Sequence, residues 1–174
     1  ISHVAFHNLD HFLSLFSYTA TAQTPQWFLD QIKVMEGVWL TDNSEYMSET
    51  ETDDTYGLEW KSGVGGTSLT GELFGMKDGK KTGLYWQFFQ YYDEDEDAII
   101  VIQVSPWGTS GRGKLLKDGD NKTKLDQVFS NSDGTSYRVG HTTEFFEGYE
   151  ISISYDINSA GEWLKSRTYK WIKQ

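Results

Sequence analysis

Residues 134–156 read GTSYRVGHTTEFFEGYEISISYD, two runs of alternating apolar and polar side chains on either side of Glu147-Gly148. Successive side chains of a β-strand point to opposite faces, so each run predicts a half-buried strand. Glycine readily adopts the positive φ that a tight turn requires, and the pair therefore predicts a hairpin. This segment indicates an antiparallel sheet.

The same turn signals recur along the chain, at Asp78-Gly79, Asp118-Gly119, Asp133-Gly134 and residues 158–161. Reading strands between such turns predicts about ten. They cover residues 37–47, 53–62, 67–77, 81–92, 97–104, 108–117, 122–131, 134–146, 149–156 and 162–173. A long up-and-down sheet tends to close on itself, because closure removes unpaired edges. The sequence therefore predicts an all-β fold, a single antiparallel up-and-down barrel of about ten strands.

Composition restricts the class of protein and its partners. With 174 residues, 37% of them hydrophobic, and only two prolines, the chain suits one core without an internal linker. We expect a barrel domain over residues 23–174, preceded by a separate segment, residues 1–22. The 26 acidic and 15 basic residues give a net charge of -11, which disfavours nucleic acid and anionic membranes as partners. The absence of cysteine excludes disulfides, thiol catalysis and thiolate metal sites.

The segment before the barrel, residues 1–22, allows two interpretations. Its apolar run, Phe12 to Tyr18, precedes Ala20 and Ala22, which resembles the end of a secretory signal and predicts a secreted or periplasmic protein. Four apolar residues at helical spacing also predict an amphipathic helix that docks on the barrel. They are Leu9, Phe12, Leu13 and Phe16. A second short helix should follow, with Thr24 as its cap, Pro25 in its first turn, and Phe28, Ile32 and Met35 on one face.

Two clusters have the residue types of a metal site. His3, His7 and His11 are spaced to share one face of a helix. Residues 93–97 are five adjacent carboxylates, but they lack the spaced ligands and glycine of a calcium loop. Solvated side chains explain both clusters, so we expect no metal site.

The alternation within each strand predicts which side chains face the interior. On residues 149–156 we expect the apolar set to face inward and the polar set, Glu150, Ser152, Ser154 and Asp156, to face water. The expected inward sets of five strands are Tyr149, Ile151, Ile153 and Tyr155; Tyr137, Val139, His141 and Phe145; Leu125, Gln127 and Phe129; Tyr56, Leu58 and Trp60; and Trp163, Arg167, Tyr169 and Trp171. The predicted lumen is aromatic.

A short helix leading into Gly37-Val38-Trp39, ten hairpin-linked strands and the late run EWLKSRTY at residues 162–169 resemble the lipocalin-like (calycin) superfamily. Residues 134–138 and the closing Glu-Trp stretch most resemble a bacterial lipocalin-like family of unknown function. The resemblance covers about residues 27–174. It implies that Trp39 plugs the closed end of the barrel, that Arg167 lies across its ring, and that the ligands are small and hydrophobic.

The predicted function is non-catalytic binding of a small apolar or aromatic molecule in the lumen. The residues expected to bind it are Tyr56, Trp60, Trp86, Phe88, Phe129, Tyr137, His141, Phe145, Tyr155 and Tyr169. The same bulky rings could instead fill a narrow barrel completely. A hollow lumen of several hundred cubic ångströms would favour binding, and solid packing would favour a structural role.

Three alternatives remain open. Residues 84–92 are aromatic on both faces and 99–104 are apolar throughout, which predicts a cover such as a second copy of the chain packed on strands 84–104. The second alternative is haem binding through His141, because the related nitrobindin-like haem barrels use a single histidine in an apolar lumen. Their histidine lies nearer the chain end than His141, so no cofactor is expected. The third alternative is an enzyme that uses His141, but the sequence contains no catalytic motif such as a G-x-S-x-G elbow.

Overall fold

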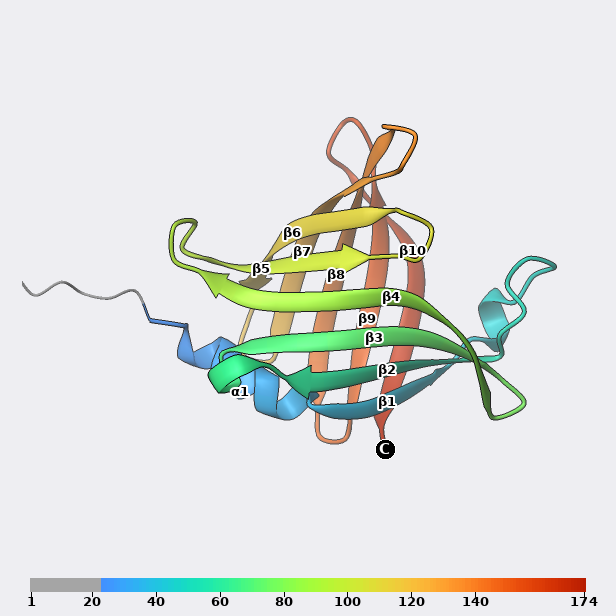
Figure 1. The fold of residues 1–174 in the computed structure, drawn as a ribbon, viewed down its shortest axis with the longest axis horizontal. Helices are drawn as coiled ribbons and strands as arrows, with labels where there is room; N and C mark the ends of the chain where they lie inside the picture. The colour runs from blue at the N-terminus through green and yellow to red at the C-terminus, as the bar shows by residue number, and fades with distance from the viewer. Residues whose placement is uncertain (1–22) are drawn as a thin grey trace, which may run out of the picture.

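Ten antiparallel strands pair in sequence order, and the first pairs with the last, so the sheet closes into a barrel (Figure 1). The computed structural model describes residues 23–174. Its elements are α1 (Gln26–Met35), β1 (Gly37–Asp42), η1 (Ser44–Tyr46), β2 (Thr55–Ser62), η2 (Val64–Gly66), β3 (Ser68–Lys77), β4 (Lys80–Asp93), β5 (Ala98–Val104), β6 (Ser110–Lys117), β7 (Lys122–Ser130), β8 (Ser136–Phe146), β9 (Tyr149–Ile157) and β10 (Trp163–Lys173). The predicted fold class and all ten strands are confirmed; only the first strand ends well before its predicted boundary, at Asp42.

The hairpins form where the glycines predicted them. Gly79, Gly134 and Gly148 have φ values of 72°, 85° and 77°, a region that other residues adopt at a cost. At Glu147-Gly148 the turn has two residues, so Phe146 pairs with Tyr149. This pairing fixes the register of β8 and β9.

Helix α1 closes one end of the barrel. Phe28, Ile32 and Met35 are buried, as their spacing predicted, and they belong to the same core as Trp39. The Trp39 indole Nε1 donates a hydrogen bond to the Met35 carbonyl oxygen at 2.7 Å. Thr24 is not the helix cap: Pro25 occupies that position and no side chain caps the first turn.

The two ends of the barrel differ in their connections. The end with α1 also carries the β4–β5, β6–β7 and β8–β9 turns, because alternate strands begin and end there. We call it the helix end. The opposite end carries the long β1–β2 connection, residues 43–54, and the β7–β8 turn. We call it the loop end.

The predicted orientation of β9 is wrong. Because β8 and β9 are joined by a two-residue turn, Glu150 lies opposite Phe145 and Ser154 lies opposite His141, and all four side chains line the lumen. Residues 149, 151, 153 and 155 therefore face outward. Their apolar surface is partly covered there: Tyr149 stacks on Phe146 with ring centroids 4.7 Å apart.

The predicted inward position of Trp163 on β10 is also wrong. Lys165 pairs with Tyr155, whereas Arg167 pairs with Ser154, so an extra residue lies between them in β10. Such a bulge reverses the faces of the residues that precede it. Trp163 therefore faces outward, while Arg167 and the odd-numbered residues that follow it face inward.

Several predictions concern residues outside the described part of the chain. These are the secretory signal with Ala20 and Ala22, the docking helix with Leu9, Phe12, Leu13 and Phe16, and the histidines His3, His7 and His11. Secretion and docking stay predictions. Within residues 23–174, no helix has the length and apolar character needed to cross a bilayer.

Candidate functional site, the barrel lumen

A cavity of about 340 Å³ occupies the barrel lumen. Eight of the ten residues that the sequence placed at a binding site line it: Trp60, Trp86, Phe88, Phe129, Tyr137, His141, Phe145 and Tyr169. The other lining residues are Met35, Leu58, Leu73, Gln90, Val101, Gln103, Leu115, Thr123, Leu125, Val139, Thr143, Glu150, Ser152, Ser154 and Trp171. The lumen is therefore hollow, and its wall is mostly apolar and aromatic.

Two of the predicted lumen residues lie elsewhere. Tyr56 points into the barrel but lies beyond the cavity, where its hydroxyl donates to Glu51 Oε1 at 2.6 Å. Tyr155 faces outward, in line with the rest of its strand, and packs edge-on against Trp163. Its aromatic ring covers the outside of the barrel, opposite Gly140.

Among the residues that line the cavity, Glu150 carries the carboxyl group. The sequence predicted that Glu150 faces water. Its side chain is 5% exposed and contributes to the cavity wall near the helix end. Oε2 has no hydrogen-bond partner within residues 23–174. Burial raises the pKa of Glu150 to about 8, because the charged form loses its hydration. At neutral pH this carboxyl group is therefore mostly protonated.

His141 lines the same cavity from β8, on the face that the sequence predicted. Burial lowers the pKa of His141 to about 4, so the imidazole is neutral at physiological pH. A neutral imidazole offers one donor and one acceptor to a bound molecule.

Three glutamines add further polar groups to the barrel interior. Gln103 Nε2 donates to Gln127 Oε1 at 2.7 Å, and both residues are buried. Among the described residues, nothing hydrogen-bonds to Gln127 Nε2 or Gln90 Oε1. Gln90 and Gln103 line the cavity. A ligand or water in the cavity could therefore hydrogen-bond to these glutamines and also to Glu150.

A hydrogen-bonded polar cluster occupies the interior at the loop end. Glu51, in the β1–β2 connection, accepts hydrogen bonds from both terminal nitrogens of Arg167, at 2.5 and 2.7 Å. This pairing lowers the pKa of Glu51 to about 2. Tyr169 donates to Asn43 Oδ1 at 2.8 Å, and Tyr56 donates to Glu51, so the cluster joins the loop to β10 and β2.

The contact between Arg167 and Trp39 that the resemblance implied does not form. Arg167 lies over the Tyr46 ring instead, 5.1 Å from its centroid, because its charge is paired with Glu51 at the loop end. Trp39 is 2% exposed at the helix end, and its cationic neighbour is Lys173, with Nζ 5.3 Å from the ring centroid. The two residues belong to different ends of the barrel.

Within residues 23–174, no three His, Cys, Asp or Glu side chains are grouped as metal ligands would be. The acidic run at 93–97 forms the β4–β5 turn, and Glu96 pairs there with Arg112 and with Lys114, the latter at 3.0 Å.

Comparison with known proteins supports the fold. No known protein family and no curated protein matches the sequence. Among solved structures, the chain is similar to the crystal structure of Rv2717c from M. tuberculosis, with a TM-score of 0.53 and 12% sequence identity. The alignment covers 84% of this chain and 96% of that one. This likeness concerns the fold and is consistent with a lipocalin-like barrel.

Proposed function

We propose that the protein is a distant lipocalin-like (calycin) member that binds a small, largely apolar or aromatic molecule in its lumen without transforming it. The cavity of about 340 Å³ inside the aromatic barrel carries this proposal. Its volume falls at the lower end of the range of small-molecule sites, roughly 300–1,000 Å³. A structural protein with a filled barrel would lack this space.

The positions of the two titratable lumen groups favour binding over catalysis. Glu150 lies opposite Phe145, and His141 lies opposite Ser154, four residues further along β9. At roughly 3.3 Å per residue, about 13 Å separates these positions. Direct proton transfer requires a hydrogen bond of about 3 Å between side-chain atoms, and Glu150 Oε2 has no such partner among residues 23–174. Each group can instead contact a different part of one ligand.

The lumen residues do not fit haem, the cofactor that the nitrobindin resemblance suggested through His141. Of the residues 23–174 that line the cavity, none is Lys or Arg, so the two carboxylates of haem would find no cationic partner there. The volume is also small for a macrocycle of that size.

Native mass spectrometry of the protein purified without denaturation tests the proposal. We expect a population that carries the extra mass of one small molecule, or, after extraction, uptake of the neutral apolar dye prodan with a blue-shifted emission. A matched pair of variants locates the site. Val139→Trp places a large ring in the lumen and should abolish uptake, whereas Thr142→Trp, on the outward face of the same strand, should retain it. Equal uptake by the two folded variants would contradict lumen binding.

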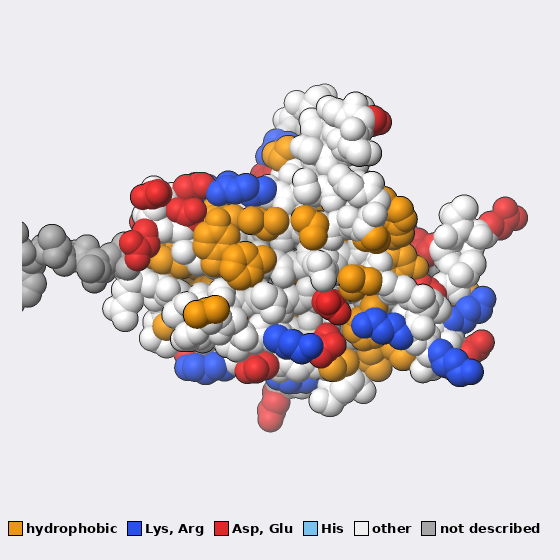
Figure 2. All heavy atoms as spheres, viewed as in Figure 1, with side chains coloured by type: hydrophobic (Ala, Val, Ile, Leu, Met, Phe, Trp, Pro, Cys, Tyr) orange, Lys and Arg blue, Asp and Glu red, His pale blue; other side chains and the backbone are white. Residues whose placement is uncertain are grey.

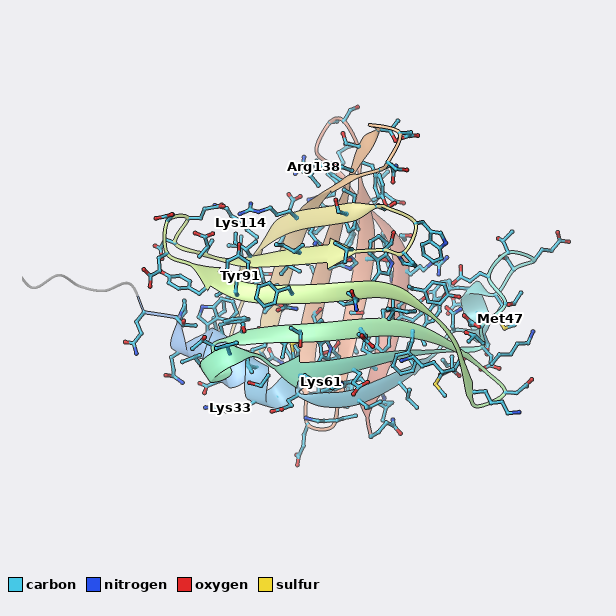
Figure 3. All side chains as sticks on the ribbon, in the orientation of Figure 1. Lys33, Met47, Lys61, Tyr91, Lys114 and Arg138 are labelled. Atoms are coloured by element: carbon cyan, nitrogen blue, oxygen red, sulfur yellow. The ribbon has the colours of Figure 1, made fainter. Side chains whose placement is uncertain are left out.

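Self-association is a second candidate function, and the outer face of β4 and β5 favours it. Figure 2 shows hydrophobic side chains gathered on this face, and Figure 3 places Tyr91 there, with Lys114 of β6 on the far side of β5. Phe89 stacks on Tyr91 with ring centroids 5.2 Å apart, and Phe89 and Val104 are 39% and 43% exposed. Such a patch is typical of a contact surface.

Light scattering after size exclusion tests this second candidate. We expect a dimer at micromolar concentration that Phe89→Ser converts to a monomer. Val128→Ser, at an exposed position on β7, should leave the dimer intact. A monomeric unmodified protein would rule out this use of the face.

A further inference from the structure

We propose that the helix end of the lumen is a subsite for an organic cation, in which the Glu150 carboxylate and the rings of Trp171 and Phe145 receive the ammonium group of an otherwise apolar ligand. This inference rests on the proposed lumen binding and names the chemical class of the ligand.

The register of three strands builds this subsite. Glu150 on β9 lies directly opposite Phe145 on β8 and Trp171 on β10, and the three side chains share the lumen face. Trp171 is held in place, since its Nε1 donates to Ser152 Oγ at 3.0 Å. Met35 of α1 lines the cavity as well, at the closed end. A carboxyl group is thus flanked by aromatic rings in a site shielded from bulk solvent.

One oxygen of this carboxyl group, Oε2, has no hydrogen-bond partner within the described chain. Glu150 is buried and lines the cavity, and its Oε2 is unpaired. A buried carboxylate without a partner is strongly unfavourable, so a group that binds it gains a large interaction. Lys173, a cation of β10 at this end, donates instead to the Val34 carbonyl oxygen at 2.7 Å and lies over Trp39. A ligand is therefore left to supply the positive charge.

The aromatic walls favour a weakly hydrated cation over a strongly hydrated one. Aromatic faces attract cations through their quadrupole, and protein sites for quaternary ammonium groups are built from such rings. A quaternary ammonium group also loses less hydration on burial than a metal ion of the same charge. The lining residues therefore fit an alkylated ammonium group attached to an apolar body.

Binding of a cation should be coupled to release of the Glu150 proton into solvent. The other titratable groups that face the cavity are His141 and Tyr137 from β8 and Tyr169 from β10; α1, β6 and β7 contribute Met35, Leu115, Thr123, Leu125 and Phe129. The pKa of His141 is lowered to about 4 by burial, and burial raises the pKa of both tyrosines above their ordinary value of 10.0. Between about pH 6 and pH 8, Glu150 is therefore the lining group whose charge changes.

Two isosteric probes test the inference: benzyltrimethylammonium, whose charge does not depend on pH, and neopentylbenzene, its neutral counterpart. Affinities are measured on the full chain by displacement of prodan. We expect the cation to bind about fifty-fold more tightly at pH 8 than at pH 6, because the ionised fraction of Glu150 rises by that factor. The neutral probe should bind equally at both pH values.

Glu150→Gln keeps the shape of the side chain and removes its charge. It should abolish the pH dependence and reduce affinity for the cation to near that for the neutral probe. Glu144→Gln makes the same change in net charge on the outward face of β8 and should leave both affinities unchanged. Circular dichroism and thermal melts verify that both variants are folded.

The outcomes separate the two proposals. If neither probe displaces the dye and the dye itself is not taken up, the proposed lumen binding fails. If both probes bind with equal affinity at every pH, lumen binding stands and the cation subsite is refuted. A preference for the cation that survives Glu150→Gln also refutes it.

Discussion

Replacement of Glu150 by glutamine should stabilise the protein at neutral and alkaline pH. Burial raises the pKa of Glu150 from an ordinary value of 4.5 to about 8. Between these values the unfolded chain has lost the proton that the folded chain still holds, so the free energy of unfolding falls as pH rises. Below about pH 4.5 both states are protonated and this loss is absent. Glutamine cannot ionise, so Glu150→Gln removes the contribution of this residue to the pH dependence of the free energy of unfolding.

The difference between the two pKa values gives the magnitude. About 3.5 units at 1.36 kcal/mol per unit amount to about 5 kcal/mol, which is of the order of a whole domain's stability. Relaxation of the site and water entering the cavity would reduce this figure. We therefore expect the free energy of unfolding of Glu150→Gln to exceed that of the unmodified protein by about 2–5 kcal/mol at alkaline pH.

His141 changes the stability in the opposite direction to Glu150 between about pH 4 and pH 6.5. Burial lowers the pKa of His141 from 6.5 to about 4, so the unfolded chain binds the extra proton between these values and stability rises with pH. Between about pH 4.5 and 6.5 the two residues nearly cancel in the unmodified protein. From about pH 6.5 to 8, only Glu150 acts, and stability should fall by about 2 kcal/mol.

Urea unfolding at several pH values, followed by tryptophan fluorescence, measures these slopes. For Glu150→Gln we expect stability to rise up to about pH 6.5 and then stay level. Glu144→Gln, on the outer face, should follow the unmodified protein. Parallel profiles for Glu150→Gln and the unmodified protein would refute the assignment of a buried, protonated carboxyl group.

Three further changes test other parts of the barrel. Trp39→Phe removes a buried hydrogen bond to α1 and should lower the free energy of unfolding by about 1–3 kcal/mol in urea melts. Because Arg167 lowers the pKa of Glu51 to about 2, Glu51→Gln should cost about 1–2 kcal/mol at neutral pH after discounting for its partial exposure, and the difference should vanish on acidification to about pH 2. Gly113→Ala would press a Cβ against a backbone carbonyl of β7 and should lower the melting temperature, whereas Gly83→Ala, which has open space, should not.

The strands and their order could be predicted because their signals are local. Turn residues and alternation lie within a few positions of each other, and Gly79, Gly134 and Gly148 adopt the positive φ that their turns require. The same reasoning identified the buried face of α1 from Phe28, Ile32 and Met35. Closure of the barrel followed from the number of hairpins.

The orientation of β9 could have been predicted from the length of its turn, but the hydrophobicity of its residues suggested the opposite orientation. The two-residue turn places Phe145 opposite Glu150, so an inward Phe145 and an inward Tyr149 are incompatible. The alternation instead suggested that the apolar residues face inward. That rule fails because the outer face has its own apolar contacts: Lys170 Nζ lies 4.4 Å from the Tyr149 ring centroid.

Other features have no local signal. The extra residue in β10 lies near Ser166, within the polar run Lys165 to Thr168 that carries no glycine or other bulge signal, and it moves Trp163 to the outside. The pairing of Arg167 with Glu51 joins residues 116 positions apart through a loop whose path the sequence does not specify. The resemblance to lipocalins gave Arg167 a role that this long-range partner prevents.

Glu51 and Glu150, two carboxyl groups of the barrel interior, are stabilised in opposite protonation states. At the loop end, Glu51 receives two hydrogen bonds from Arg167 and one from Tyr56, and its pKa falls. At the helix end, Glu150 receives nothing from residues 23–174 at Oε2, and its pKa rises. A glutamine would fit the same space with less penalty above neutral pH, so selection for stability alone does not account for Glu150. Under the proposed cation binding, the carboxyl group that destabilises the empty barrel would stabilise the occupied one.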